Sequence, residues 1–112
     1  MAKGDFLGEF EVYVMLALAH QGADAYGVTI RREIEARTGR TVAIGAVYAT
    51  LARLEAKGFV QYRMSDPQPV QGGRARKYFT LTEPGARALR HSTAMLGRMI
   101  AGLSPKWRGG QW

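Results

Sequence analysis

The sequence contains no cysteine, no asparagine and only two histidines, and each shortage narrows what the chain can do. Without cysteine the chain forms no disulfide, no thiolate nucleophile and no cysteine metal site. The two histidines, His20 and His91, fall in different predicted helices and do not form a catalytic or metal-binding group with one another. We therefore expect a protein that is not an enzyme and that holds no metal and no cofactor.

The sequence also lacks a long hydrophobic run. The longest, residues 12–19, has eight residues, whereas a membrane-spanning helix needs about 18 or more. Glu9 and Glu11 interrupt the apolar stretch near the start, so no secretory pattern is present. We expect a cytoplasmic protein without a membrane partner. The chain has 112 residues, 46% of them hydrophobic and 22% charged, which is the composition of one folded domain.

Acidic residues are scarce in the second half of the chain. Residues 1–52 hold five Lys/Arg and six Asp/Glu, a net charge of −1, whereas residues 53–112 hold eleven and three, a net charge of +8. Such a concentration of positive charge favours a nucleic acid or an anionic membrane surface as the partner. A surplus of arginine that only keeps the protein soluble is the alternative.

Hydrophobic spacing predicts four helices and one β-hairpin. Apolar residues three and four positions apart predict helices over Asp5–His20, Ala25–Arg37, Ala43–Lys57 and Thr82–Leu103. Stretches rich in β-branched and aromatic residues predict strands over Phe59–Met64 and Arg76–Thr82. The expected helix ends are set by caps at Asp5 and Thr82 and by glycines at Gly39 and Gly58.

The order of these elements is helix, helix, turn, helix, hairpin, helix, which is the order of a winged helix-turn-helix. The expected fold class is therefore mainly α with a small β-hairpin, a winged helix-turn-helix with N- and C-terminal dimerisation helices. Residues 1–103 would form this domain, including the dimerisation helices. Residues 104–112 are expected to form a flexible C-terminal tail.

Three stretches of the sequence resemble one known family. They are Ala25-Tyr-Gly to Ile30, the run from Ile44 to Gly58, and the run from Gly72 to Thr82 followed by Gly85. In residue types and combined spacing, the chain from about residue 7 to 103 resembles the PadR family of bacterial transcriptional regulators, in its compact class. Members are typically dimeric DNA-binding repressors, and many respond to small aromatic or drug-like compounds. The resemblance implies double-stranded DNA, a second copy of the chain and a small aromatic effector as partners.

The third predicted helix has the features of a DNA-recognition helix. Its apolar residues occupy one arc, and the opposite face holds small residues that allow close approach to a major groove. The candidate DNA contacts on this helix are Gly45, Ala46, Tyr48, Ala49, Arg53 and Lys57. Family members often have Ser, Thr or Pro where this chain has Ala46 and Ala49, so side-chain hydrogen bonds to bases are not expected there. The alternatives are plain helix propensity for the alanines and core packing for Tyr48.

The loop between the two predicted strands is the candidate wing. Gly72 and Gly73 permit a tight tip, and three cations follow within four positions: Arg74, Arg76 and Lys77. Strand alternation places Arg74 and Arg76 on one face and Lys77 with the apolar residues on the other. A positive wing beside a recognition helix would contact the DNA backbone or the minor groove. An ordinary solvated hairpin tip is the alternative.

The first and last helices have more apolar surface than one short chain can cover. The candidate dimer contacts are Phe6, Phe10, Val14, Met95, Leu96, Met99, Ile100 and Leu103. We expect a homodimer built from these two helices, with a wide intramolecular face as the alternative.

The sequence therefore predicts a sequence-specific regulator of transcription that binds double-stranded DNA. We expect a dimeric repressor on a pseudo-palindromic operator, released by a small aromatic ligand. Because fold does not determine function, an RNA- or protein-binding winged-helix module without operator specificity is the alternative.

Overall fold

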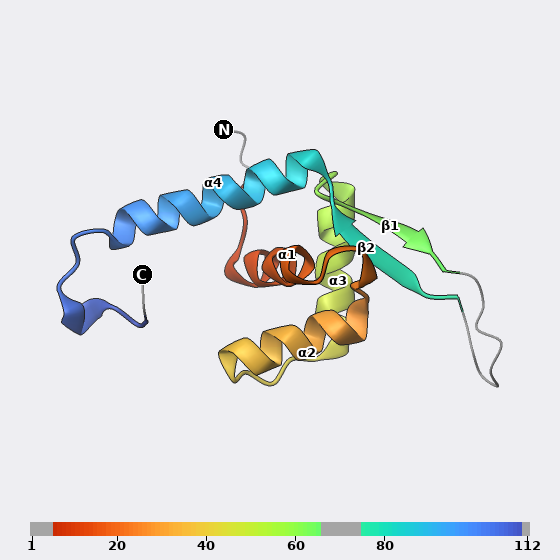
Figure 1. Ribbon diagram of the computed structural model, residues 1–112, viewed down its shortest axis with the longest axis horizontal. Helices are drawn as coiled ribbons and strands as arrows, with labels where there is room; N and C mark the ends of the chain where they lie inside the picture. Colours follow the sequence, from red (N-terminus) through yellow and green to blue (C-terminus); the bar gives the residue numbers. More distant parts are fainter. Residues whose placement is uncertain (1–5, 66–74, 111–112) are drawn as a thin grey trace.

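The computed structural model describes residues 6–65 and 75–110, and the predicted order of elements is confirmed (Figure 1). The helices and strands are α1 (Glu9–Gln21), α2 (Gly27–Thr38), α3 (Ile44–Ala56), β1 (Val60–Met64), β2 (Lys77–Leu81) and α4 (Glu83–Ile100). Two short 3-10 turns are η2 (Gly22–Asp24) and η3 (Pro105–Trp107). The fold is a winged helix-turn-helix, mainly α with one small β-hairpin.

The start of α1 differs from the prediction of Asp5, a residue that lies outside the described part of the chain. Phe6, Leu7 and Gly8 are not helical, and Gly8 is the N-cap with extended backbone. The Gly8 N–H donates to Glu11 Oε1 at 2.9 Å, which satisfies one of the amides that a helix start leaves free. Apolar spacing alone extended the predicted helix through Phe6, because this side chain continues the pattern without being helical.

The turn between α2 and α3 is fixed by a glycine and a carboxylate. Gly39 has φ 74°, and its N–H donates to the Glu35 carbonyl, so the expected glycine stop is confirmed. The Val42 N–H donates to Glu35 Oε2 at 2.9 Å, and the Val42 side chain is buried. These contacts hold α3 at its angle to α2.

The hairpin is antiparallel and is joined by a third segment. Val60 pairs with Leu81 and Met64 with Lys77 at its two ends. On the other edge of β2, the Phe79 N–H donates to the Ala25 carbonyl at 2.8 Å. This bond ties the hairpin to the chain just before α2, and the hairpin then extends away from the helices (Figure 1).

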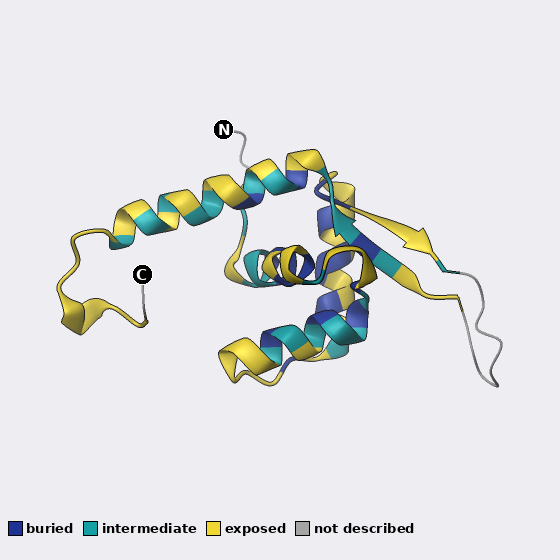
Figure 2. Cartoon of the chain, viewed as in Figure 1, coloured by how far each residue is buried: buried dark blue, intermediate teal, exposed yellow. Residues whose placement is uncertain are grey.

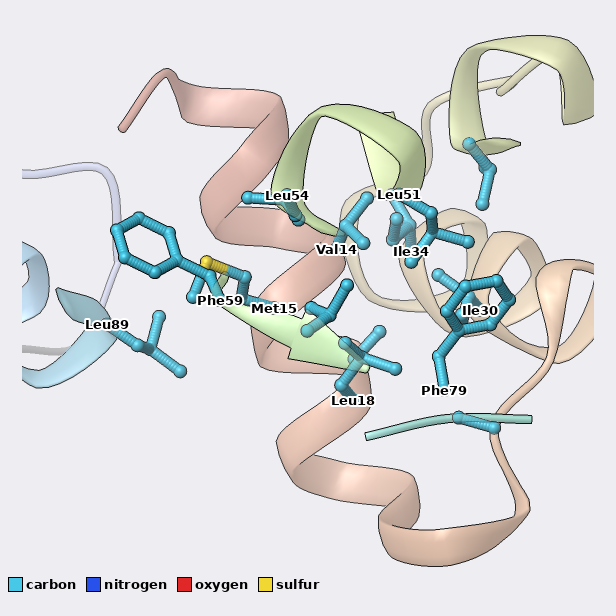
Figure 3. Close-up of a cluster of buried hydrophobic side chains, with 14 of the residues drawn as sticks. Val14, Met15, Leu18, Ile30, Ile34, Leu51, Leu54, Phe59, Phe79 and Leu89 are labelled. Atoms are coloured by element: carbon cyan, nitrogen blue, oxygen red, sulfur yellow. The ribbon is translucent and has the colours of Figure 1, made fainter. Parts of the chain in front are cut away.

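The core forms around α1, with Phe59 and Leu89 to one side of it in the view and Ile30 and Phe79 to the other (Figure 3). The inner side of α3 is buried, as its apolar spacing predicted. The buried hydrophobic residues are Val14, Met15, Ala17, Leu18, Ala25, Ile30, Ile34, Val42, Val47, Leu51, Leu54, Phe59, Val60, Phe79 and Leu89. Thr50 joins them, although the sequence analysis did not place it in the core.

α4 is buried only near its start. Thr82 Oγ1 accepts from the Gly85 N–H at 3.1 Å, which confirms the predicted cap, and Gly85 and Leu89 are buried. Farther along, the helix alternates between exposed and half-buried residues and extends beyond the body (Figure 2). It ends at Ile100, three residues before the predicted end. Within the part of the chain that the structure describes, no helix is both long and apolar enough to cross a membrane.

Candidate nucleic-acid interface

One side of α3 carries small exposed residues, which together with Arg53 form what we name the recognition face: Gly45, Ala46, Ala49, Ala52, Arg53 and Ala56. A β-carbon built on Gly45 would meet no atom within 4 Å, so the backbone there is open to an approaching molecule. Ala52 lies seven residues after Gly45 on the same side of the helix but was not among the predicted contacts. Because five of the six side chains are no larger than a methyl group, a groove wall could reach the helix backbone.

Tyr48 lies beside the recognition face, against the start of α2. Its side chain is 47% exposed, so it is not a core residue. A β-carbon on Gly27 would overlap the Tyr48 Cζ and hydroxyl oxygen, which shows that the ring packs directly on this glycine. The ring is thereby held at the junction of α2 and α3. The Tyr26-Gly27 pair in the sequence was a signal for this packing, which spacing alone did not predict.

Arg53 and Lys57 lie along one edge of α3 and share a carboxylate from α1. Lys57 Nζ is 3.0 Å from Glu11 Oε2, and Arg53 Nε is 4.0 Å from the same oxygen. Arg53 also donates to Thr50 Oγ1 at 3.0 Å. The Arg53 side chain is 57% exposed and that of Lys57 is 28% exposed. The ion pair between Glu11 and the Lys57 ammonium group was not predicted from the sequence.

Burial raises the pKa of the Glu11 carboxyl. This effect is outweighed by the hydrogen bond from the Gly8 N–H, by the hydrogen bond and charge of Lys57, and by the charge of Arg53. The pKa of Glu11 is therefore below its ordinary value, and the carboxylate is ionised at neutral pH.

Cations and aromatic rings alternate at the base of the wing. The Arg63 guanidinium lies 4.6 Å from the centre of the Tyr78 ring, and that of Arg76 lies 4.3 Å from the Tyr26 ring. Tyr26 and Tyr78 meet edge to face, with ring centres 5.8 Å apart. Such cation–π contacts orient the guanidinium groups while leaving N–H donors free for other partners. Tyr26, Arg63 and Tyr78 were not among the predicted site residues.

The opposite side of the hairpin holds Lys77, whose Nζ lies 4.1 Å from the centre of the Tyr62 ring. Arg76 and Lys77 thus lie on opposite faces, as strand alternation predicted. Arg74, Gly72 and Gly73 lie outside the described residues.

The recognition helix and the wing meet around the start of α2. Tyr48 packs on Gly27, and Arg76 lies over Tyr26, the residue just before it. One dipeptide therefore connects side chains from α3 and from the hairpin. An exposed helix flanked by a positive hairpin is suited to a DNA groove and its adjoining phosphates.

One arginine that was not among the predicted site residues has a buried polar atom. Arg31, on α2, has a buried Nε with no hydrogen-bond partner among the described residues. A buried N–H without a partner is costly, so an acceptor from a bound molecule or water would satisfy it. Within residues 6–65 and 75–110, no three His, Asp or Glu side chains lie close enough together to hold a metal ion.

A second surface lies between α1 and α4. An apolar groove of about 680 Å³ separates these helices, and Phe6, Tyr13, Leu16, Met95 and Leu96 are among the residues that line it. Large apolar side chains of α4 and of the turn after it are only partly covered or are exposed. We call this set the α4 face: Met95, Leu96, Met99, Ile100 and Leu103.

Among the candidate dimer contacts, Val14 was wrongly assigned, because it is 0% exposed in the core of its own subunit. Phe10 packs partly against the same core. Phe6, Leu96, Met99 and Leu103 are exposed, and Met95 and Ile100 are partly covered. A strongly amphipathic helix with an uncovered apolar side is typical of a protein interface.

Comparisons with known proteins give one consistent result. The family model described as "Transcriptional regulator PadR-like family" matches residues 15–91. Among solved structures, a PadR-like transcription factor from Bacteroides fragilis is 26% identical, with 80% of this chain and 82% of that chain covered and a TM-score of 0.68. A PadR family regulator from Clostridium difficile is 24% identical, with coverage of 83% and 95% and a TM-score of 0.68.

A third similar structure is BpsR of Bordetella bronchiseptica, described by the regulation of its DNA binding by 6-hydroxynicotinic acid. It is 18% identical, with 95% of this chain and 74% of that chain covered and a TM-score of 0.68. At this identity the likeness shows the fold alone. No curated protein matches the sequence.

Proposed function

Because this chain belongs to the PadR-like family of transcriptional regulators, we propose that it binds a specific DNA operator as a homodimer and represses transcription in the cytoplasm. The observation that supports this most directly is the junction at Tyr26-Gly27, where side chains from the recognition helix and the wing come together. A single bound duplex would meet both elements at this junction.

The proposed contacts divide into two groups. Gly45, Ala46 and Ala49 would lie against base edges, where alanine methyl groups meet thymine methyl groups. The proposed phosphate contacts are Tyr48, Arg53, Lys57, Arg74, Arg76 and Lys77. With no asparagine in the chain and no glutamine on the recognition face, specificity would depend on arginine contacts, methyl contacts and DNA shape.

The homodimer would bury the α4 face and the exposed residues at the start of α1. Two-fold symmetry would then place two recognition helices about one helical turn of DNA apart, roughly 34 Å. A pseudo-palindromic operator follows from this symmetry.

Regulation by a small aromatic molecule is the finer part of the proposal. The apolar groove between α1 and α4 has a volume suited to such a ligand and includes the aromatic rings of Phe6 and Tyr13. BpsR, whose DNA binding is regulated by 6-hydroxynicotinic acid, has the same fold. A ligand in this groove would change the packing of two helices that the dimer also uses.

Selection of bound duplexes from a random DNA pool by the purified protein tests the proposal. The expected result is one enriched motif with two-fold symmetry and half-sites about one helical turn apart. A specific complex should compete at least about 10³-fold better than random duplex. Absence of an enriched motif, or equal binding to RNA of the same length, would instead favour a winged-helix module with another partner.

A further inference from the structure

Glu11 is an unusual charged residue for its position. It lies in the first turn of α1, it is only 8% exposed, and its carboxylate points to α3 rather than to solvent. Oε1 accepts from the Gly8 N–H at 2.9 Å, and Oε2 lies 3.0 Å from Lys57 Nζ and 4.0 Å from Arg53 Nε. One buried carboxylate thus faces two cations of the recognition helix.

The other ion pairs among the described residues have a different character. Arg37–Glu33 lies within α2, Arg87–Glu83 and Arg90–Glu83 lie within α4, and Glu9–Arg40 joins two exposed side chains. Exposed pairs of this kind contribute little, whereas a mostly buried pair is screened less by salt. The Glu11–Lys57 pair is more buried than these pairs and is therefore screened less by salt.

The same two cations are those best placed on α3 to contact a DNA backbone. A cation that is already neutralised by a protein carboxylate releases fewer counterions when it approaches a phosphate. A negative charge beside the recognition helix also repels the polyanion directly. Glu11 and the DNA phosphates are thus alternative partners of Lys57 and Arg53.

We propose that Glu11 is an affinity-determining residue that competes with the DNA backbone for Lys57, and in part for Arg53, and so weakens these two phosphate contacts. The inference rests on the proposed DNA-binding function and deepens it. With Glu11 in place, binding depends more on the small residues of α3 and on the wing, and less on phosphate attraction that is the same for every sequence. Glu11 in this way lowers non-specific binding more than operator binding.

The location of Glu11 also connects it to the groove. Gly8, which donates to its carboxylate, directly follows Phe6 and Leu7, and both of these line the groove between α1 and α4. A partner subunit or ligand that moved this segment would also move Gly8 and so change its hydrogen bond to the Glu11 carboxylate. The number of cations available on α3 would then depend on what occupies the groove.

The test measures binding of the full chain to a random-sequence duplex between 50 and 200 mM salt, for the unmodified protein and for Glu11→Gln. The amide keeps an oxygen for the Gly8 N–H but removes the charge that holds the two cations. We expect the slope of log K against log salt to become steeper by about one for each cation freed per subunit. At 0.1 M salt the affinity should rise roughly 5–10-fold for each.

Glu9→Gln is the matched control. It removes the same charge two residues earlier on the same helix, but Glu9 pairs with Arg40 and not with α3. We expect it to change the slope by much less. An equal change in the two variants would mean that only net charge matters and would overturn the proposal.

Lys57→Gln in both backgrounds completes a double-mutant cycle. Its effect on the slope should be greater by about one in the Glu11→Gln background, where the lysine is free to contact phosphate. Equal effects in the two backgrounds, or weaker binding by Glu11→Gln at an unchanged slope, would show that Glu11 positions the cations instead, and would also overturn the proposal.

Circular dichroism shows whether each variant is folded. If Glu11→Gln does not fold, Glu11→Asp replaces it, since the shorter carboxylate lies farther from Lys57 and should give a smaller gain of the same sign. No gain from a folded Glu11→Asp would then count against the proposal. Failure of the proposed function itself would appear differently, as an unmodified protein that does not bind duplex DNA at any salt concentration.

Discussion

The core leaves two exposed surfaces with opposite chemistry. The recognition face of α3 is made of Gly, Ala and one Arg, whereas the α4 face is made of large apolar side chains, with Leu96 50% and Met99 78% exposed. Small side chains and positive charge favour close approach to a polyanion, and large apolar side chains favour burial against another protein. One short chain thus presents, on two helices that share a core, two surfaces suited to two different kinds of partner.

The two surfaces also differ in how they are held. α3 is buried along its whole inner side through Val47, Thr50, Leu51 and Leu54. α4 is fixed only at its start, where Gly85 packs against the backbone of Phe59, and the exposed part extends from that anchor. The direction of the α4 face therefore depends on contacts near the helix start, which are the packing of Gly85 on Phe59 and the burial of Leu89 in the core.

A substitution at Gly85 should break this anchor. In Gly85→Ala the new β-carbon would overlap the Phe59 carbonyl oxygen, which accepts from the Thr82 N–H and cannot move independently. We expect a loss of about 3 kcal/mol in the free energy of unfolding, measured by urea denaturation. The matched control is Gly97→Ala on the same helix, where nothing lies within 4 Å of the new atom. It should stabilise the protein by about 0.5–1 kcal/mol. Similar values for both variants would remove the distinction between the two halves of α4.

Two substitutions on α4 should make the α4 face polar. Leu96→Glu combined with Met99→Glu places two charges where the proposed partner subunit packs. The dimer dissociation constant should rise at least about 100-fold, equivalent to about 2.7 kcal/mol, by analytical ultracentrifugation. Arg98→Glu changes the net charge by the same two units on another side of the helix and should leave the dimer intact. A double variant that stayed dimeric at the same concentration would place the subunit contact elsewhere.

The elements of the fold could be predicted from the sequence because apolar spacing has a direct physical cause. The periods of α2, α3 and α4 follow residues such as Ile30, Leu51 and Leu89, which are buried. The same spacing does not distinguish a side chain covered by its own chain from one covered by a partner subunit. Val14 was assigned to a partner subunit, but the core of its own chain covers it, because both kinds of cover produce the same stripe.

On the DNA side, the third prediction concerns the wing. Arg76→Ala removes a guanidinium that is exposed and oriented by Tyr26. The slope of log K against log salt should become shallower by about one per subunit, with an affinity loss of roughly eightfold at 0.1 M salt. Adding Arg74→Ala should bring the change in slope to about two. Arg108→Ala, which removes an exposed arginine after α4, is the control and should have little effect. If the Arg76 and Arg108 variants behaved alike, positive charge would be acting without regard to position.

The candidate site could be predicted only in part, for reasons of distance along the chain. Exposure of Ala46, Ala49 and Arg53 follows from helix geometry, so the position of each residue within one helix was enough to predict it. The pair between Glu11 and Lys57 joins residues 46 positions apart, and neither helix pattern contains that information. The packing of Arg76 on Tyr26 depends likewise on the bond between β2 and Ala25, which is a property of the whole fold.

A smaller loss of duplex affinity is expected from a change at Tyr48, which lies at the edge of the recognition face. Tyr48→Phe keeps the ring on Gly27 and removes only the hydroxyl, so unfolding should be unchanged while duplex affinity falls by about 1 kcal/mol if the hydroxyl donates to a phosphate. Tyr13→Phe is the control, since Tyr13 lies on α1 in the groove between α1 and α4 and is not among the proposed DNA contacts. Gly27→Ala supplies the complementary change: it keeps the hydroxyl but displaces the half-exposed ring. If both Tyr48→Phe and Gly27→Ala bound duplex normally in a filter-binding titration, Tyr48 would have only a packing role, and the DNA-facing surface would be narrower than proposed.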